Sequence, residues 1–517
     1  MRLRSLPPAL DSTLDSALDS VLVAVVAAVV YAVHGFEGTL VRDLGVFTYG
    51  GQRVADGVLP YVGIFNTVGP LADAVPGAAI RVGELIGVGP VSAERHLFWV
   101  LSVGCCVLVA ALGRRVGGSR VVGLLAAALF LTFEDFTHLA TNGPREKTVM
   151  VLFLLAAMLL LERRRWTAAG ACTALATLTW QPALLVAVTA AVTTLLRTPR
   201  GEVGRLRAVA GYVLGGAVPT ALVVAVYAVQ GELHRGLLGF LLVNARYTRQ
   251  TSVYSAPHFV ADVLWEGYGW SLVLVLAGLV AAVGAAVVAL IRGPRDARVT
   301  LGAAALVGVV WTTTAVNGAP DLFVVLPFAA VGAALALHAL LAALAALARR
   351  PGWAAPVLAG LTAGVVVLAG VQSAATRQVG LRAQERDVDA VLAAVPDADL
   401  MAIDAPQVLA LAGRVSPTPF QIFDVGIDGY LEATWPGGLQ GFAAWIAARR
   451  PTLIVRALDD HQTWPDAMLA RHYVLAGCGP QWRWYVSRAA GPAVLDAVRE
   501  ANRQARWGTR RAGAPVG

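Results

Sequence analysis

The chain has 517 residues, of which 57% are hydrophobic and 14% are charged, and its net charge is +8. A mean hydropathy of +0.66 excludes an ordinary soluble protein, and continuous apolar runs exclude a membrane β-barrel built from alternating segments. The positive charge comes from arginines in short connections between these runs, so it reports membrane topology and not a nucleic-acid partner. We therefore expect a polytopic α-helical membrane protein.

About eleven membrane-spanning helices follow one another along the chain in this interpretation. Their centres lie near residues 27, 104, 127, 154, 173, 189, 218, 280, 307, 334 and 363. Arginines cluster in five connections, at residues 114–120, 163–165, 197–207, 292–298 and 349–350. If the N-terminus is cytoplasmic, all five connections face the cytoplasm, as positively charged loops do. The sequence thus predicts a multi-pass protein of the plasma membrane with a cytoplasmic N-terminus.

The first external connection contains the polar segment VRDLGVFTYGGQRVADGVLPYVGIFNTVGPL, residues 41–71. Its apolar residues follow helical spacing after Asp43, which predicts a short helix at the membrane surface. Gly57 and Pro60 then end that helix. Asp43 is either a helix cap or a catalytic group, because a carboxylate at the outer end of a span suits proton removal from an acceptor hydroxyl during glycosyl transfer.

The second external connection carries an acidic pair, Glu134 and Asp135, with His138 close by. These three residues are candidates for orienting an acceptor or for binding a divalent cation such as Mg²⁺ or Mn²⁺, and either acid is also a candidate for replacing Asp43 as the base. The alternative is a solvated helix end with no part in the chemistry. Beyond this candidate cation, the sequence indicates no cofactor.

A lipid-phosphate substrate at the outer surface needs cationic side chains that face it. The candidates on the outer side are Arg145, Lys147, Arg246, Arg249 and His258. Lys147 is the only lysine of the chain, and we favour it as the phosphate contact. The alternative for each of the five is contact with an ordinary lipid headgroup.

The composition changes after the last expected span. From residue 374 onwards, short apolar strands such as Leu453–Val455 alternate with amphipathic helical pieces, which predicts a small α/β domain. An odd number of spans places this domain outside the cell. Residues 506–517 are rich in Arg, Gly and Ala and predict a disordered tail. The expected division is a transmembrane module at 1–373, an extracytoplasmic domain at 374–505 and the tail at 506–517.

The segment after the first span resembles the first external loop of the GT-C superfamily of glycosyltransferases, which use polyprenyl-phosphate sugars. The resemblance is to the protein mannosyltransferase, aminoarabinose transferase and arabinosyltransferase type. The matching residues are Asp43, Phe47, Tyr49, Gly57, Pro60, Tyr61, Pro70 and Leu71. Leu44 stands where many relatives have a second acidic residue. The resemblance implies a GT-C-like fold with interfacial helices in this loop, and Asp43 as the catalytic base.

A membrane glycosyltransferase of cell-wall biogenesis is the function that this resemblance implies. It would move a sugar from a polyprenyl-phosphate donor to a glycan, lipid or protein acceptor on the outer face, with inversion. Two other classes stay open: a transporter or flippase for lipid-linked sugars, and a non-catalytic envelope-assembly protein with a docking domain. A transporter keeps charged groups inside its spans, and the expected spans are nearly free of them.

Overall fold

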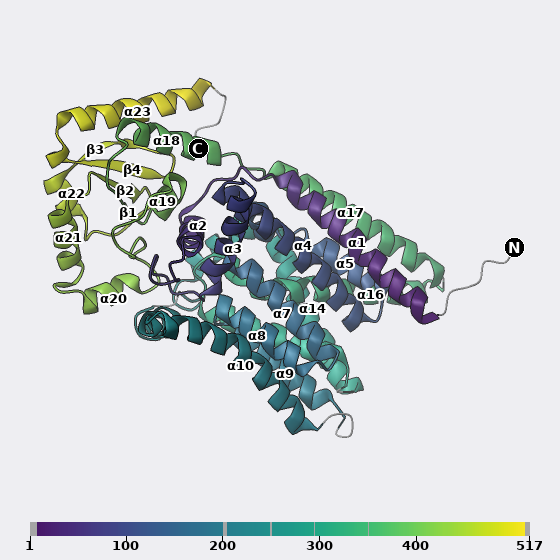
Figure 1. Cartoon of the computed structure of the whole chain (residues 1–517). Coiled ribbons are helices and arrows are strands. Elements are labelled where there is room, and N and C mark those ends of the chain that lie inside the picture. The colour runs from purple at the N-terminus through teal and green to yellow at the C-terminus, as the bar shows by residue number, and fades with distance from the viewer. Residues whose placement is uncertain (1–7, 200–203, 249–250, 294, 350, 512–517) are drawn as a thin grey trace. The chain divides into compact units, whose positions relative to one another are not determined.

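The computed structural model describes residues 8–199, 204–248, 251–293, 295–349 and 351–511. Contacts divide the chain into two compact units, and each unit is assembled from three separate segments. The first, which we call the helical unit, comprises Met1–Gly35, His96–Val223 and Gln250–Arg377. The second, which we call the mixed unit, comprises Phe36–Arg95, Val224–Arg249 and Gln378–Gly517 (Figure 1). The units therefore cut across a linear division at residue 374.

Seven helices in the described part of the chain are long and apolar enough to cross a membrane. A span needs about 20 residues, because an α-helix rises about 1.5 Å per residue through about 30 Å of hydrocarbon. These helices are α1 (Pro8–His34), α4 (Pro90–Gly117), α10 (Arg205–Val229), α14 (Ser271–Arg292), α15 (Ala297–Thr314), α16 (Leu326–Leu347) and α17 (Ala354–Ala375). The predicted polytopic α-helical class is confirmed.

The other four expected spans fall on shorter helices. Three of them, α7 (Glu146–Glu162), α8 (Trp166–Thr179) and α9 (Ala183–Arg197), have 17, 14 and 15 residues. The fourth falls on a pair, α5 (Arg120–Phe130) and α6 (Glu134–Asn142), which is bent by 72°. Among the described residues there are thus seven full spans, or eight with the bent pair, and the number eleven stays a prediction.

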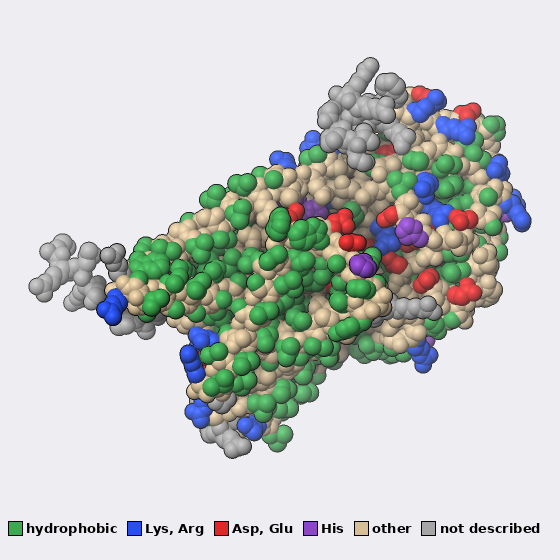
Figure 2. All heavy atoms as spheres, turned by 180° about the vertical axis from the view of Figure 1, so that it is seen from behind, with side chains coloured by type: hydrophobic (Ala, Val, Ile, Leu, Met, Phe, Trp, Pro, Cys, Tyr) green, Lys and Arg blue, Asp and Glu red, His purple; other side chains and the backbone are tan. Residues whose placement is uncertain are grey.

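Small residues let the helices of the helical unit approach closely. A side chain at Gly278 of α14 would collide with the backbone of Ala329 on α16, and one at Gly332 of α16 would collide with the backbone of Gly278. Membrane helices associate through such small residues, because lipid provides no hydrophobic drive between them. Other faces expose large apolar side chains, including Leu214 and Leu222 of α10. Figure 2 shows the broad apolar surface of this unit.

The first external connection folds into two helices of the mixed unit, α2 (Arg42–Ala55) and α3 (Leu71–Leu85), which pack together. Gly51 of α2 lies against Gly77 of α3, where a side chain would collide with the facing helix. Gly57 follows the end of α2 with a φ of +85°, a conformation that glycine adopts without strain. The predicted helix and its end near Gly57 are both present.

The C-terminal segment builds a four-stranded sheet in the order β1-β2-β4-β3. The strands are β1 (Leu400–Ile403), β2 (Leu453–Ala457), β3 (Tyr473–Cys478) and β4 (Trp482–Ser487). β1 and β2 are parallel, and β4 is antiparallel to both β2 and β3. The helices of this segment are α18 (Leu381–Ala394), α19 (Pro406–Ala412), α20 (Ile427–Thr434), α21 (Gly438–Arg449), α22 (Asp466–His472) and α23 (Pro492–Arg511). The predicted small α/β domain is confirmed.

Hydrogen bonds tie the first external connection to the C-terminal segment within the mixed unit. The side chain of Gln384 on α18 donates to the backbone oxygen of Leu40 at 3.0 Å and accepts from its N–H at 2.8 Å. The amide of Gln52 on α2 donates to the backbone oxygen of Ala410 on α19 at 2.8 Å. Gln384 is fully buried, so these bonds satisfy groups that would otherwise be left unpaired away from water.

Short elements complete the described chain. They are α11 (Leu233–Leu237), a π-helix (Leu238–Leu242), α12 (Val243–Arg246), α13 (Pro257–Tyr268) and three 3₁₀ turns (Ala319–Val324, Pro351–Trp353 and Arg488–Ala490). Helix α23 continues through residues 506–511, which the sequence assigns to a disordered tail. The rest of that tail, 512–517, lies outside the described residues.

Candidate functional site

Asp43 lies in the first turn of α2, and 52% of its side chain is exposed. The first backbone N–H groups of a helix have no partner within the helix, and a negatively charged side chain beside them is stabilising. Arg42 brings a full positive charge, with its Nη2 atom 3.4 Å from Oδ1 of Asp43. The helix end and Arg42 thus both present positive charge to an exposed carboxylate.

Arg42 is held by two further carboxylates of the mixed unit. Its Nη2 atom lies 2.6 Å from Oδ2 of Asp424, and its Nη1 atom lies 3.9 Å from Oδ1 of Asp404. Burial opposes the charge of Arg42, but Asp424, Asp43 and Asp404 outweigh this effect and raise the pKa of the guanidinium above its ordinary value. Three carboxylates therefore surround one arginine, and this arginine is next to Asp43 in the chain.

Asp404 occupies a special backbone position directly after strand β1. Its φ is +52°, in the left-handed region, and its side chain is only 3% exposed. The carboxylate accepts a hydrogen bond from the backbone N–H of Phe423 at 2.9 Å. Burial raises the pKa of Asp404 to about 8, although Arg42 acts in the opposite direction. Burial also raises the pKa of Asp424, again against the effect of Arg42.

The motif residues Tyr49, Pro60 and Tyr61 are buried and shape the first external connection. The hydroxyl of Tyr49 accepts a hydrogen bond from the backbone N–H of Ser416 at 2.9 Å. Tyr61 has a φ of +67°, and its ring stacks on that of Tyr227 with centroids 6.1 Å apart. The Tyr227 hydroxyl donates to the backbone oxygen of Pro60 at 3.2 Å. These residues hold the loop in shape and do not present groups to solvent.

Arg246 is exposed at the end of α12 and belongs to the same unit as Asp43. The amide of Asn244 on this helix donates to the backbone oxygen of Thr67. The hydroxyl of Thr248, just after the helix, donates to the backbone oxygen of Val425 at 2.7 Å. The segment of Arg246 is therefore fixed to both the first external connection and the C-terminal segment. The neighbouring candidate, Arg249, lies outside the described residues.

A buried charge cluster lies in the helical unit at the start of α7. The Nζ atom of Lys147 lies 2.9 Å from Oε1 of Glu146 and 3.0 Å from Oδ1 of Asp321. Arg145 approaches Glu146 with 3.3 Å between Nε and Oε2. Lys147 also lies over the ring of Trp180, 5.2 Å from its centroid. The side chains of these four charged residues are between 1% and 9% exposed.

This burial bears on the predicted phosphate contacts. Lys147 and Arg145 are 5% and 8% exposed, and both contact carboxylates. Both cations already neutralise buried carboxylates. Either could contact a phosphate only if it first left its ion pair. His258, at the start of α13 in the same unit, is exposed. Among the described candidates, Arg246 and His258 are the accessible ones.

The acidic pair of the second external connection opens α6. An oxygen of Glu134 accepts a hydrogen bond from the side-chain amide of Gln372 at 3.1 Å. Nδ1 of His138 lies 3.0 Å from Nε2 of His34, at the end of α1. Within the described residues, no group of three or more His, Cys, Asp or Glu side chains is arranged to hold a metal ion. Glu134, Asp135 and His138 thus do not fit the predicted Mg²⁺ or Mn²⁺ site as they stand.

Solved structures of other proteins share the architecture of this chain. ArnT from Cupriavidus metallidurans superposes with a TM-score of 0.59 when bound to undecaprenyl phosphate and 0.60 in the apo state. Both are 17% identical and cover 91% of this chain and 99% and 98% of ArnT. The chain has the GT-C fold. The oligosaccharyltransferase of Archaeoglobus fulgidus, in complex with Zn and sulfate, also matches, with a TM-score of 0.51, 13% identity and coverage of 91% of this chain and 74% of that one.

This likeness confirms the fold that the resemblance of the first external loop implies. No protein-family model and no curated protein matches the sequence. At identities of 13% to 17% the likeness concerns the fold, so the roles of individual side chains depend on the geometry of this chain.

The sequence singles out Asp43 as a candidate but does not indicate the residues that surround it. Arg42 gives no signal beyond its position next to Asp43. Asp404 has a recognisable signal, because it directly follows the apolar run Leu400–Ile403, and polar groups that follow parallel strands often gather at one sheet edge. Asp424 lies in an irregular segment, and only the folded chain shows that it contacts Arg42.

Proposed function

We propose that this protein is a membrane glycosyltransferase that moves a sugar from a polyprenyl-phosphate donor to a cell-envelope acceptor on the outer face. The observation that carries this proposal is the half-exposed carboxylate of Asp43, placed beside Arg42 in the first external connection of a GT-C fold. The lipid class of the donor is supported by the ArnT structure, which is bound to undecaprenyl phosphate. We further infer from the arginine distribution a cytoplasmic N-terminus and an external C-terminal domain.

Asp43 acts as the general base in this reaction. The hydroxyl oxygen of the acceptor attacks the anomeric carbon of the sugar while its proton passes to the carboxylate of Asp43. The bond between that carbon and the donor phosphate breaks, and the phosphate leaves with the bonding electrons. Attack on the face opposite the phosphate inverts the anomeric centre. The protein mainly has to align the two substrates and offer positive charge to the leaving phosphate.

Arg42 positions the base in this proposal. Because Asp424 contacts its guanidinium at 2.6 Å, Arg42 stays next to the first turn of α2 rather than moving freely in solvent. The C-terminal segment thus fixes Arg42 beside Asp43 through Asp424. Asp404 and Asp424 act through Arg42 and have no direct part in the chemistry.

Arg246 is the preferred contact for the donor phosphate. It is exposed, it belongs to the same unit as Asp43, and its planar guanidinium can bind two phosphate oxygens at once. Lys147 and Arg145, which are buried in ion pairs, and His258 are the second choice. No step of the reaction is routed through a metal ion.

The transporter alternative gains no support from the buried cluster of the helical unit. Transporters place charged groups near the middle of discontinuous spans. Here Arg145, Glu146 and Lys147 lie at the beginning of α7, and Asp321 lies in a 3₁₀ turn before α16. The charges therefore lie at helix ends, where the ion pair of Lys147 with Asp321 connects the start of α7 to the turn before α16.

Membranes that contain the protein test the proposal directly. A panel of radiolabelled polyprenyl-phosphate sugars is incubated with these membranes, and transfer of label to envelope glycan, lipid or protein is measured. We expect transfer from one donor class and none in membranes without the protein. Label that crosses the membrane while it remains attached to the polyprenyl lipid would instead identify a flippase. Absence of transfer from every donor would contradict the proposal.

A further inference from the structure

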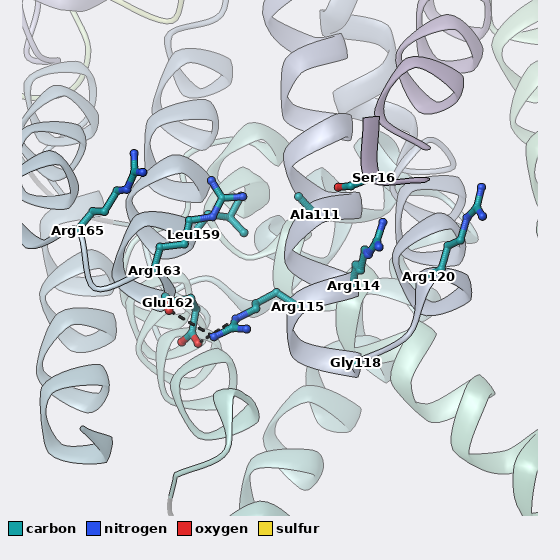
Figure 3. A pocket seen from close by; sticks show the side chains of 10 residues that line it. All are labelled: Ser16, Ala111, Arg114, Arg115, Gly118, Arg120, Leu159, Glu162, Arg163 and Arg165. Atoms are coloured by element: carbon teal, nitrogen blue, oxygen red, sulfur yellow. Dashed lines mark hydrogen bonds and ion pairs between the residues drawn. The ribbon is translucent and has the colours of Figure 1, made fainter. Parts of the chain in front are cut away.

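A cavity of about 760 Å³ opens in the helical unit, between the end of α4, the start of α5 and the turn that joins α7 to α8 (Figure 3). The charged residues of its wall are Arg114, Arg115, Arg120, Arg163, Arg165 and Glu162. Its size is within the range of small-molecule sites. Five arginines and one acid make it a strongly basic cavity, and none of these residues has a part in the proposed transfer.

Two carboxylates pair with arginines of the cavity wall: Glu162, which lines the cavity, and Asp19, which lies next to it. Asp19 of α1 contacts both Arg114, at 3.3 Å, and Arg120, at 2.7 Å. Glu162 lies 3.8 Å from Arg115 and also contacts a second arginine, Arg197. Each acid thus serves two cations, which leaves an excess of positive charge around the cavity.

Arg163 and Arg165 add two further positive charges to the cavity wall. Both are exposed, and neither forms an ion pair with a carboxylate within the part of the chain that the structure describes. They sit in the tight turn between α7 and α8, where Arg164 has a φ of +59°. This turn fixes the two arginines on the wall of the cavity, although their guanidinium groups have no anionic partner there.

The directions of the side chains point to a ligand within the membrane boundary. Figure 3 shows the guanidinium groups of Arg114, Arg120, Arg163 and Arg165 turned away from the connection at Gly118 and along the bodies of the helices. Basic side chains that only keep a loop in water extend away from the hydrocarbon. These groups instead extend along the helices of the cavity wall, which include α4, a helix long and apolar enough to cross a membrane.

We propose that the arginine-lined cavity binds the phosphate of an anionic phospholipid. The guanidinium groups of Arg163 and Arg165 donate hydrogen bonds to the phosphate oxygens, because a guanidinium matches phosphate in both shape and charge. Ala111 and Leu159, which also line the cavity, provide apolar contact for the glycerol and the first acyl carbons. Basic pockets between membrane helices recognise lipid headgroups in this way. A lipid bound in the cavity would contact α4, α5 and α7 where these helices line it.

Binding of lipid to the full-length protein in neutral detergent tests this proposal. Phosphatidylglycerol or phosphatidylcholine is added, bound lipid is counted by native mass spectrometry, and the melting temperature is recorded. We expect phosphatidylglycerol to bind and to raise the melting temperature, and phosphatidylcholine to do neither. A parallel sample with inorganic phosphate separates lipid recognition from recognition of the free anion. An equal rise with inorganic phosphate, or equal binding of both lipids, would overturn the proposal.

Matched double variants locate the site. In R163Q/R165Q we expect the affinity for phosphatidylglycerol to fall at least tenfold and the rise in melting temperature to disappear. R205Q/R207Q removes two exposed arginines at the same spacing from the start of α10 and should bind the lipid normally. R163K/R165K keeps the charge, should retain most of the binding, and shows that the turn still folds. Equal binding by R163Q/R165Q and R205Q/R207Q would contradict the site.

Discussion

The two units of this chain each contain a cluster of opposite charges, and the clusters differ in exposure. In the mixed unit, Arg42 contacts Asp43 and Asp424, whose side chains are 52% and 38% exposed. In the helical unit, Lys147 contacts Asp321, and these side chains are 6% and 8% exposed. An ion pair between a basic and an acidic side chain is therefore partly exposed to water in the mixed unit and buried in the helical unit.

Exposure decides what each cluster contributes. An exposed ion pair contributes about 0–1 kcal/mol to stability, so its groups remain available to a substrate. A buried pair contributes little over an apolar pair of the same shape, but removal of one partner costs about 3–5 kcal/mol, because the other charge is left without compensation. We expect substitution of the exposed Asp43 to change activity, and substitutions in the helical-unit cluster or at the buried Asp404 to change stability.

The largest expected effect belongs to Asp43. D43N keeps the shape of the side chain but removes the proton acceptor, so transfer should fall by about 10²–10⁴-fold, as is typical for loss of a general base. The protein should remain folded, because the side chain is half exposed. D56N at the other end of α2, which changes a 57% exposed aspartate paired with Arg53, is the matched control and should stay active. Full transfer by D43N would remove Asp43 as the base.

K147M should be next in magnitude, and its effect should be on folding. The change leaves Asp321 buried without its cation and Glu146 with Arg145 alone, which we expect to destabilise the protein by about 3–5 kcal/mol. The yield of monodisperse protein and the melting temperature in detergent report this loss. Adding D321N should restore part of the stability, since one uncompensated charge is then removed. A stable K147M protein that binds the donor weakly would instead support Lys147 as a phosphate contact.

A further effect should appear in the pH dependence of stability. Burial raises the pKa of Asp404 to about 8, against about 3.9 in an unfolded chain, so between these values the folded state binds the extra proton. Stability should then decrease as the pH rises from about 4 to about 8, by up to about 1.4 kcal/mol per pH unit from this group. D404N should flatten the profile of melting temperature against pH. An identical slope in wild type and D404N would exclude this assignment.

Arg246 should give the smallest of these effects. R246Q removes one charge-assisted contact to the donor phosphate, worth about 1.5–3 kcal/mol, so KM for the donor should rise at least tenfold. The rate at saturating donor should change less than KM, because the chemistry at Asp43 is untouched. R235Q, which changes a half-exposed arginine of α11 in the same unit, should leave both unchanged. Equal behaviour of the two variants would shift the phosphate contact to His258 or to the buried cations.

Much of the fold is predictable from local pattern. Long apolar runs specify α1 and α14, because about 20 such residues can cross a membrane only as a helix. The spacing after Asp43 specifies α2, and the positive φ of Gly57 ends it. The number of complete spans is less predictable, since an apolar helix such as α8 can be too short to cross.

The surroundings of the candidate base are not predictable in the same way. Asp404 and Asp424 reach Arg42 only because a distant segment folds against the first external connection, and single-sequence patterns do not contain that pairing. The favoured role of Lys147 also depends on tertiary structure. Its partner Asp321 lies far along the chain, and the ion pair between them buries a lysine that the sequence places at an outer surface.

The bonds between Leu40 and Gln384 impose an order on biosynthesis. These residues are 344 positions apart, so α2 leaves the ribosome long before the segment that holds it. Contacts of such separation form late, because a long stretch of chain must be closed first. A chain that stops before α18 would carry Asp43 on a helix without its supports. We therefore expect the supported position of the Asp43 carboxylate to form only after α18 and Asp424 have been translated.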